Sequence, residues 1–188
     1  MHDSLERYRD YLGLLARLQV DPRMRGRIDL SGAVQQTLFE AHQVLRDGDG
    51  HTAEERLAWL RTCLANNLRD EFRKLNADMR DVRRERSLEA ALGQSSQRLE
   101  AWLIATGSSP SEHCQGQELA LQLATALAAL PEAQREALVL QHWHGWKVAE
   151  IAEHLGRTRT AVAGLLKRGL AKLREELESL TAESSSGT

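Results

Sequence analysis

Apolar residues recur every three or four positions along most of this 188-residue chain, a spacing that puts them on one face of a helix. Leu5, Leu12 and Leu15 begin one such stripe, which predicts a helix over residues 4–19. No strand-like alternation of any length appears between the stripes. Aromatic residues make up only 4%, so the core has to be built mainly from leucine and alanine. We therefore predict an all-α fold.

Local signals divide the stripes into separate helices. Asp21-Pro22 ends the first helix, and a second stripe follows over about 30–45 with Asp29 or Ser31 as its N-cap. A third stripe runs over 57–75. There Thr52 is placed to cap the helix, with Glu55 completing a capping box.

Beyond residue 77 the chain becomes highly charged and then rich in glutamine and serine, which is typical of a joint between domains. We expect two small helical domains, at 1–86 and 112–180, a polar linker at 87–111 and a disordered tail at 181–188. A short helix is expected at about 99–104, inside the linker. Further helix starts are predicted at Ser109–Glu112 and at Pro131.

The window from 148 to 167 has the pattern of a helix-turn-helix. Ala152 is small where the second helix crosses the first, and Gly156 tolerates a left-handed turn. Ile151, Leu155, Val162 and Leu166 are apolar where the two helices meet. Thr158 is placed to cap the second helix, the one that enters the major groove in such motifs.

The outward residues of that second helix are suited to DNA. From 156 to 174 the chain has six basic residues and no acidic one, although its overall net charge is −2. A basic stretch of this kind matches the phosphate backbone, and arginine also reads guanine edges. The predicted contacts are Arg157, Arg159, Thr160, Ala163, Gly164, Lys167 and Arg168.

The residues before the 148–167 window resemble part of a known protein family. Leu130-Pro131-Glu132, Gln134-Arg135 and the stretch 138–140 resemble the promoter-binding C-terminal domain of bacterial sigma factors of the extracytoplasmic-function (ECF) type. Trp59-Leu60, Asn66, Asp70 and Arg73-Lys74 are similar to the other domain of that family.

The stripe over 30–45 resembles the polymerase-docking helix of these factors. Val34-Gln35, Thr37 and Ala41 match, whereas Gln36 replaces the usual acidic residue. The long linker is similar to that of the subgroup common in planctomycetes.

The resemblance implies a promoter-specificity subunit without catalytic activity or cofactor. Core RNA polymerase would be bound by Leu30, Val34, Gln35, Gln36 and Leu38. The melted minus-ten element would be bound by Arg61, Asn66, Arg69, Arg73, Lys74, Asn76 and Arg80. Double-stranded promoter DNA at the minus-thirty-five element would meet the second domain. An anti-sigma protein is a further candidate partner, and we expect no stable homo-oligomer.

The sequence lacks the signals of membrane, secreted and metal-binding proteins. No apolar run approaches the ~18 residues of a membrane helix, and the polar N-terminus lacks the core of a signal peptide. Cys63 and Cys114 form no close pair, which suits the cytoplasm. His142 and His144 have no second pair at zinc spacing, so we expect solvent-facing or capping histidines and no metal.

Two other functions remain compatible with parts of the pattern. A helix-turn-helix repressor or activator would bind DNA without polymerase, but it leaves Trp59, Asn66 and Asp70 unexplained. A helical adaptor would bind other proteins only, and it leaves the acid-free stretch 156–174 unexplained.

Overall fold

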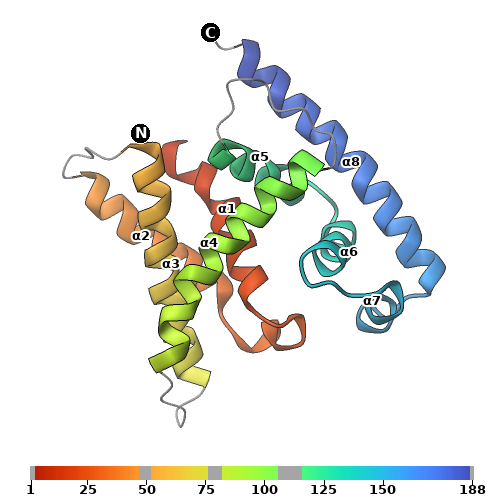
Figure 1. Ribbon diagram of the computed structural model, residues 1–188, viewed down its shortest axis with the longest axis horizontal. Coiled ribbons are helices and arrows are strands. Elements are labelled where there is room, and N and C mark those ends of the chain that lie inside the picture. The colour runs from red at the N-terminus through yellow and green to blue at the C-terminus, as the bar shows by residue number, and fades with distance from the viewer. Residues whose placement is uncertain (1–2, 47–51, 76–81, 106–115, 187–188) are drawn as a thin grey trace. The chain divides into compact units, whose positions relative to one another are not determined.

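The computed structural model describes residues 3–46, 52–75, 82–105 and 116–186. Within these ranges every regular element is a helix, so the predicted all-α fold is confirmed (Figure 1). Contacts divide the chain into unit 1, Met1–Glu100, and unit 2, Ala101–Thr188. Over the described ranges, no helix combines the length and the apolar character needed to span a membrane.

Unit 1 begins with helices whose ends are fixed by local caps. Its first elements are α1 (Asp3–Gln19), the 3-10 helix η1 (Pro22–Arg27), α2 (Leu30–Arg46) and α3 (Ala53–Leu75). The carboxylate of Asp29 accepts a hydrogen bond from the Gly32 amide at 2.8 Å, so Asp29 rather than Ser31 caps α2. Thr52 and Glu55 exchange bonds of 2.8 and 3.2 Å, which confirms the predicted capping box.

The core of this unit is made by the predicted stripes. Leu12 and Leu15 of α1 and Leu60, Leu64 and Leu68 of α3 are all fully buried. Helices α1, α2 and α3 each lie close to the other two. Burial of each leucine contributes roughly 1.5–3 kcal/mol to the free energy of folding relative to exposure. The buried leucines therefore hold the three helices together.

The structure differs from the predicted linker. Residues from Val82 to Ala105 form one helix, α4, where we expected a polar joint from 87 and a short helix at 99–104. Leu92 and Leu99 are fully buried, and they lie seven positions apart on one helical face. The glutamine- and serine-rich composition therefore hid a helix, and unit 1 extends to Glu100 rather than to residue 86.

Unit 2 contains four further helices: α5 (Gly116–Ala128), α6 (Glu132–His142), α7 (Val148–His154) and α8 (Arg159–Ser186). The carbonyl of Pro131 accepts bonds from the Gln134 and Arg135 amides at 2.9 and 3.0 Å, so Pro131 opens α6 from its N-cap position. The helix start predicted at 109–112 lies outside the described residues. Helix α8 contacts each of the other three helices.

Most of the tail that we expected to be disordered, 181–188, is helical. Helix α8 continues to Ser186, because Leu173 and Leu177 extend its buried stripe and no breaker occurs before Gly187.

Two glycines set the geometry of unit 2. At Gly169 an added Cβ would lie 3.1 Å from Leu138 Cδ1 and 3.3 Å from Gln134 Cβ, so α6 and α8 approach closely there. Gly145 has a φ of +70°, which ends the α6 region with a left-handed turn.

Truncation of Leu138 tests this packing. Leu138 is fully buried and meets Gly169 of α8, so Leu138→Ala should destabilise unit 2 by about 2–5 kcal/mol. Chemical denaturation followed by circular dichroism measures the loss. Lys167→Ala, at an exposed position of α8, should change the free energy of unfolding by less than about 0.5 kcal/mol. Equal stability of the two variants would contradict the packing.

Candidate nucleic-acid interface

Helices α7 and α8 form a helix-turn-helix. The turn is closed by hydrogen bonds from the Leu155 amide to the Ile151 carbonyl at 2.9 Å and from the Arg157 amide to the Ala152 carbonyl at 2.8 Å. Gly156 stands between them with a φ of +60°, the left-handed conformation predicted for it. The turn that directs α8 away from α7 therefore depends on a glycine.

The contact between the two helices follows the predicted pattern. Ile151 and Val162 are fully buried, and Ala152 and Leu166 are buried as well. Leu155 is only half-buried, so it closes the edge of this small core. At the start of α8 the hydroxyl of Thr158 accepts a bond from the Ala161 amide at 3.1 Å, which confirms the predicted cap.

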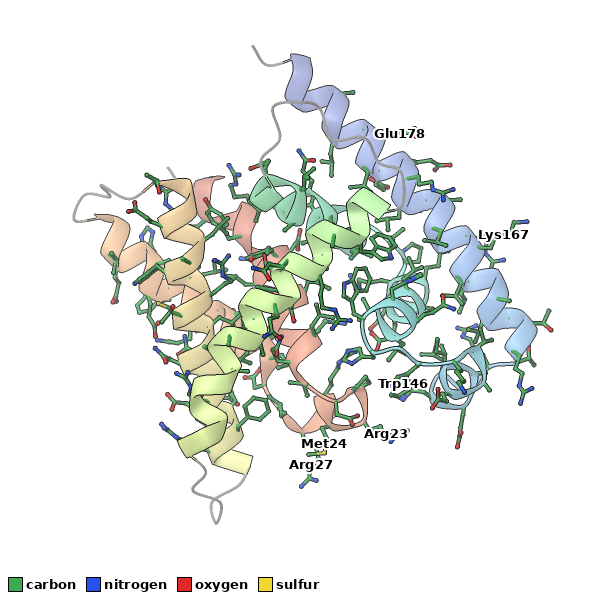
Figure 2. The ribbon with its side chains drawn as sticks, viewed as in Figure 1. Arg23, Met24, Arg27, Trp146, Lys167 and Glu178 are labelled. Carbon is green, nitrogen blue, oxygen red and sulfur yellow. The ribbon has the colours of Figure 1, made fainter. Side chains whose placement is uncertain are left out.

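The outward face of α8 is basic in its first half. The structure leaves six of the predicted DNA-contacting residues exposed and one, Gly164, half-buried; the exposed ones are Arg157, Arg159, Thr160, Ala163, Lys167 and Arg168. Acidic residues return only after Arg174, with Glu175, Glu176 and Glu178. Figure 2 shows Lys167 and Glu178 projecting from the outer side of α8, one in each half.

In unit 1 the predicted DNA-contacting residues of α3 already have protein partners. Arg61 is half-buried and donates to the Tyr11 hydroxyl at 3.2 Å. Asn66 accepts from Arg69, and Arg73 pairs with Asp70 at 3.1 Å. Lys74 bonds to Glu71, which raises the pKa of Lys74. Exposed pairs of this kind contribute little to stability in water, so a phosphate can compete for the cations. Asn76 and Arg80 lie outside the described residues.

The predicted docking face of α2 needs one correction and one addition. Val34 is 6% exposed and belongs to the core of unit 1, so its side chain is unavailable to a partner. Leu30 and Leu38 are half-buried, and Gln35 and Gln36 are exposed.

The sequence pattern missed the aromatic residue of that face. Phe39 is 56% exposed and lies three positions after Gln36, on the same side of α2. Val44, 46% exposed, lies in the last turns of the same helix. Helical phase alone places Phe39 beside the exposed glutamines, so the signal was present in the sequence.

Polar groups fix α2 against α3. Asn67 donates to the buried hydroxyl of Thr37 at 3.0 Å and to Glu40 at 3.4 Å. Cys63 lies near the same site, where burial and then the charge of Glu40 raise the pKa of its thiol to about 11. Sequence reasoning selected Asn66, whereas its neighbour Asn67 makes the contact between helices.

An aromatic cluster surrounds His142 in unit 2. Its ring centroid lies 5.3 Å from that of Trp102 and 6.1 Å from that of Trp143. His142 is thus half-buried, in contrast to the solvent-facing or capping position that we expected. Burial lowers its pKa, and its Nε2 atom is buried without a hydrogen-bond partner among the described residues. Within the described ranges no three potential metal ligands come together.

Acidification should therefore destabilise unit 2. A lowered pKa in the folded state means that the unfolded chain binds the proton more readily, so stability is lost as the pH falls below the ordinary value of 6.5. We expect the thermal midpoint to fall from pH 6.5 towards pH 5 and to fall less in His142→Gln. His154→Gln, at an exposed histidine, is the matched control. Parallel curves for the wild type and His142→Gln would contradict the assignment.

Known proteins match one segment of the chain. Residues 120–173, which run from α5 into the middle of α8, match the family described as Sigma-70, region 4. The RNA polymerase sigma-E factor of Streptomyces avermitilis is 45% identical over 53 residues, 28% of this chain and 30% of that protein. The RNA polymerase sigma-E factor of Streptomyces antibioticus is 43% identical over 56 residues, 30% of this chain and 31% of that protein.

The matches leave most of the chain uncovered. They span less than a third of the length of these two curated relatives, and no solved structure matches the chain significantly. The helix-turn-helix and the helices that support it are therefore similar in sequence to region 4 of the sigma-70 family.

Proposed function

We propose that this chain is a sigma factor of the ECF type, which binds core RNA polymerase and directs it to specific promoters. The observation that carries the proposal is the exposed, acid-free basic face of α8 within a segment that matches Sigma-70, region 4. The cytoplasm is the compartment that this function requires. The planctomycete-like subgroup and an anti-sigma partner remain predictions.

Unit 2 binds the minus-thirty-five element as a duplex in this proposal. The first half of α8 enters the major groove, where arginine pairs with guanine edges and Thr160 or Ala163 meets a thymine methyl group. Small residues at 163 and 164 allow the helix to approach the bases closely. Basic residues further along the helix contact phosphates.

Unit 1 docks on the polymerase and holds the melted minus-ten element. The docking face of α2 consists of Gln35, Gln36 and Phe39, with Phe39 in place of the buried Val34. An exposed aromatic ring among polar side chains is typical of a binding hot spot. Arg69, Arg73 and Lys74 of α3 supply cations for the single strand.

The decisive experiment is co-purification with bacterial core RNA polymerase followed by run-off transcription on fragmented genomic DNA of the source organism. A stoichiometric complex that yields discrete transcripts supports the proposal. DNA binding without polymerase binding would instead indicate an ordinary repressor or activator. Failure of both, with folded protein, would indicate an adaptor.

Substitution of Phe39 tests the docking face. Phe39→Asp should weaken polymerase binding by about 10- to 100-fold, because an exposed aromatic anchor is lost and a charge enters the interface. Its melting temperature should stay close to that of the wild type. Met24→Asp, at a residue that is 40% exposed on η1, is the control and should bind normally. Equal binding of both variants would remove Phe39 from the interface.

Substitution of Arg159 tests base recognition. Arg159→Ala should cost about 1–3 kcal/mol of binding free energy and relax the preference at one base pair, measured by selection from a random duplex library. Lys172→Ala should weaken binding to all DNA sequences alike and reduce the slope of log affinity against log salt concentration by about one. A uniform loss across sequences for Arg159→Ala would refute a base contact.

A further inference from the structure

The helix α4 is held on unit 1 by hydroxyl groups. Tyr11 of α1 donates to the Ser96 hydroxyl at 3.0 Å, and Gln19 of α1 donates to the Ser95 hydroxyl at 2.9 Å. Ser95 and Ser96 are 9% and 4% exposed; the Tyr11–Ser96 bond is buried, and the Gln19–Ser95 bond is partly buried. We call these four residues the serine seam.

Over the part of the chain that the structure describes, α4 lies less close to the other helices of unit 1 than those helices lie to one another. Among the described residues, the fully buried leucines of α4 are Leu92 and Leu99. Its backbone does not approach α1, α2 or α3 as closely as those three approach one another. Between the two leucines the helix carries Gly93, Ser95 and Ser96, which are poor helix formers. We therefore expect the part of α4 on unit 1 to open more readily than the core around it, while Trp102 near its end stays packed on Trp143 with ring centroids 5.1 Å apart.

The same seam also bonds to a cation. The Tyr11 hydroxyl that donates to Ser96 also accepts from Arg61 of α3 at 3.2 Å. While α4 is docked, this hydroxyl is buried, and Arg61 is tied to it. If α4 leaves, water competes for both groups, and the Arg61 guanidinium is free to reach a phosphate.

We propose that α4 is a latch that lowers the affinity of the free protein for single-stranded DNA by holding Arg61 in the serine seam. The docked latch is the low-affinity form, and release of α4 produces the high-affinity form. The inference rests on the proposed function for its biological meaning, because single-stranded DNA is the ligand assigned to α3. The opening of α4 itself does not depend on that function.

The test uses the full chain and two matched double variants. Ser95→Ala/Ser96→Ala removes the seam, whereas Gln94→Ala/Gln97→Ala changes two exposed positions of the same helix. The serine variant gains more helix propensity than the glutamine variant, which favours the closed helix and so works against the expected opening. Tyr11→Phe is a second seam variant that leaves the sequence of α4 unchanged and keeps the buried ring.

Two measurements follow from the latch. Hydrogen exchange of peptides within 88–99 should be several-fold faster in both seam variants than in the wild type or the glutamine control. Binding of a fluorescein-labelled 20-nucleotide single strand of mixed sequence should be about three- to tenfold tighter in the seam variants. Arg61→Ala added to either seam variant should abolish the gain.

Each other outcome overturns a defined step. Unchanged exchange in both seam variants would show that the seam does not hold α4. Faster exchange with unchanged DNA affinity, or a gain that survives Arg61→Ala, would show that the latch does not act through Arg61. A parallel pull-down with core polymerase reports on the proposed function separately, since a chain that fails to bind polymerase can still show the exchange difference.

Discussion

Burial of leucine stripes is the constraint on which both units depend. A single helix of this composition exposes its apolar face to water. Packing against the apolar stripe of a neighbouring helix shields that face from water. In unit 1 α1 and α3 approach each other, and their fully buried leucines include Leu12, Leu15, Leu60 and Leu64. In unit 2 the stripe of α8 runs past α5, α6 and α7, and the close approach at Gly169 seats it against Leu138. The outward side chains are then free to differ, because the inward ones determine where each helix lies.

Features that depend on neighbouring residues were predictable from the sequence. The capping box of Thr52 and Glu55, the turn at Gly156 and the cap at Thr158 each involve residues a few positions apart. Helical phase predicted the core leucines in the same way. The exposed basic face of α8 also follows from phase, although its contact with DNA remains a prediction.

Features that depend on distant partners were not predictable in this way. Tyr11 and Ser96 are 85 positions apart, and nothing in the local composition around Ser96 indicates a buried hydroxyl. The glutamines and serines of α4 therefore suggested a tether, although the leucine spacing allowed a helix. Val34 was assigned to a partner because it matched a family pattern, while the fold placed it in the core. Phe39 was missed because a large aromatic residue is more often buried than exposed.

The reversal of charge along α8 has a directional consequence. The helix is basic up to Arg174 and acidic from Glu175 to Glu178, so it carries an electric dipole made of whole charges in addition to the dipole of its backbone. Near a polyanion, the first half is attracted and the second half is repelled, and the two forces together exert a torque. That torque turns the helix so that its N-terminal end approaches first, before any base is contacted. The order of residues in α8 thus selects the end that leads, and added salt weakens this selection as it screens the field.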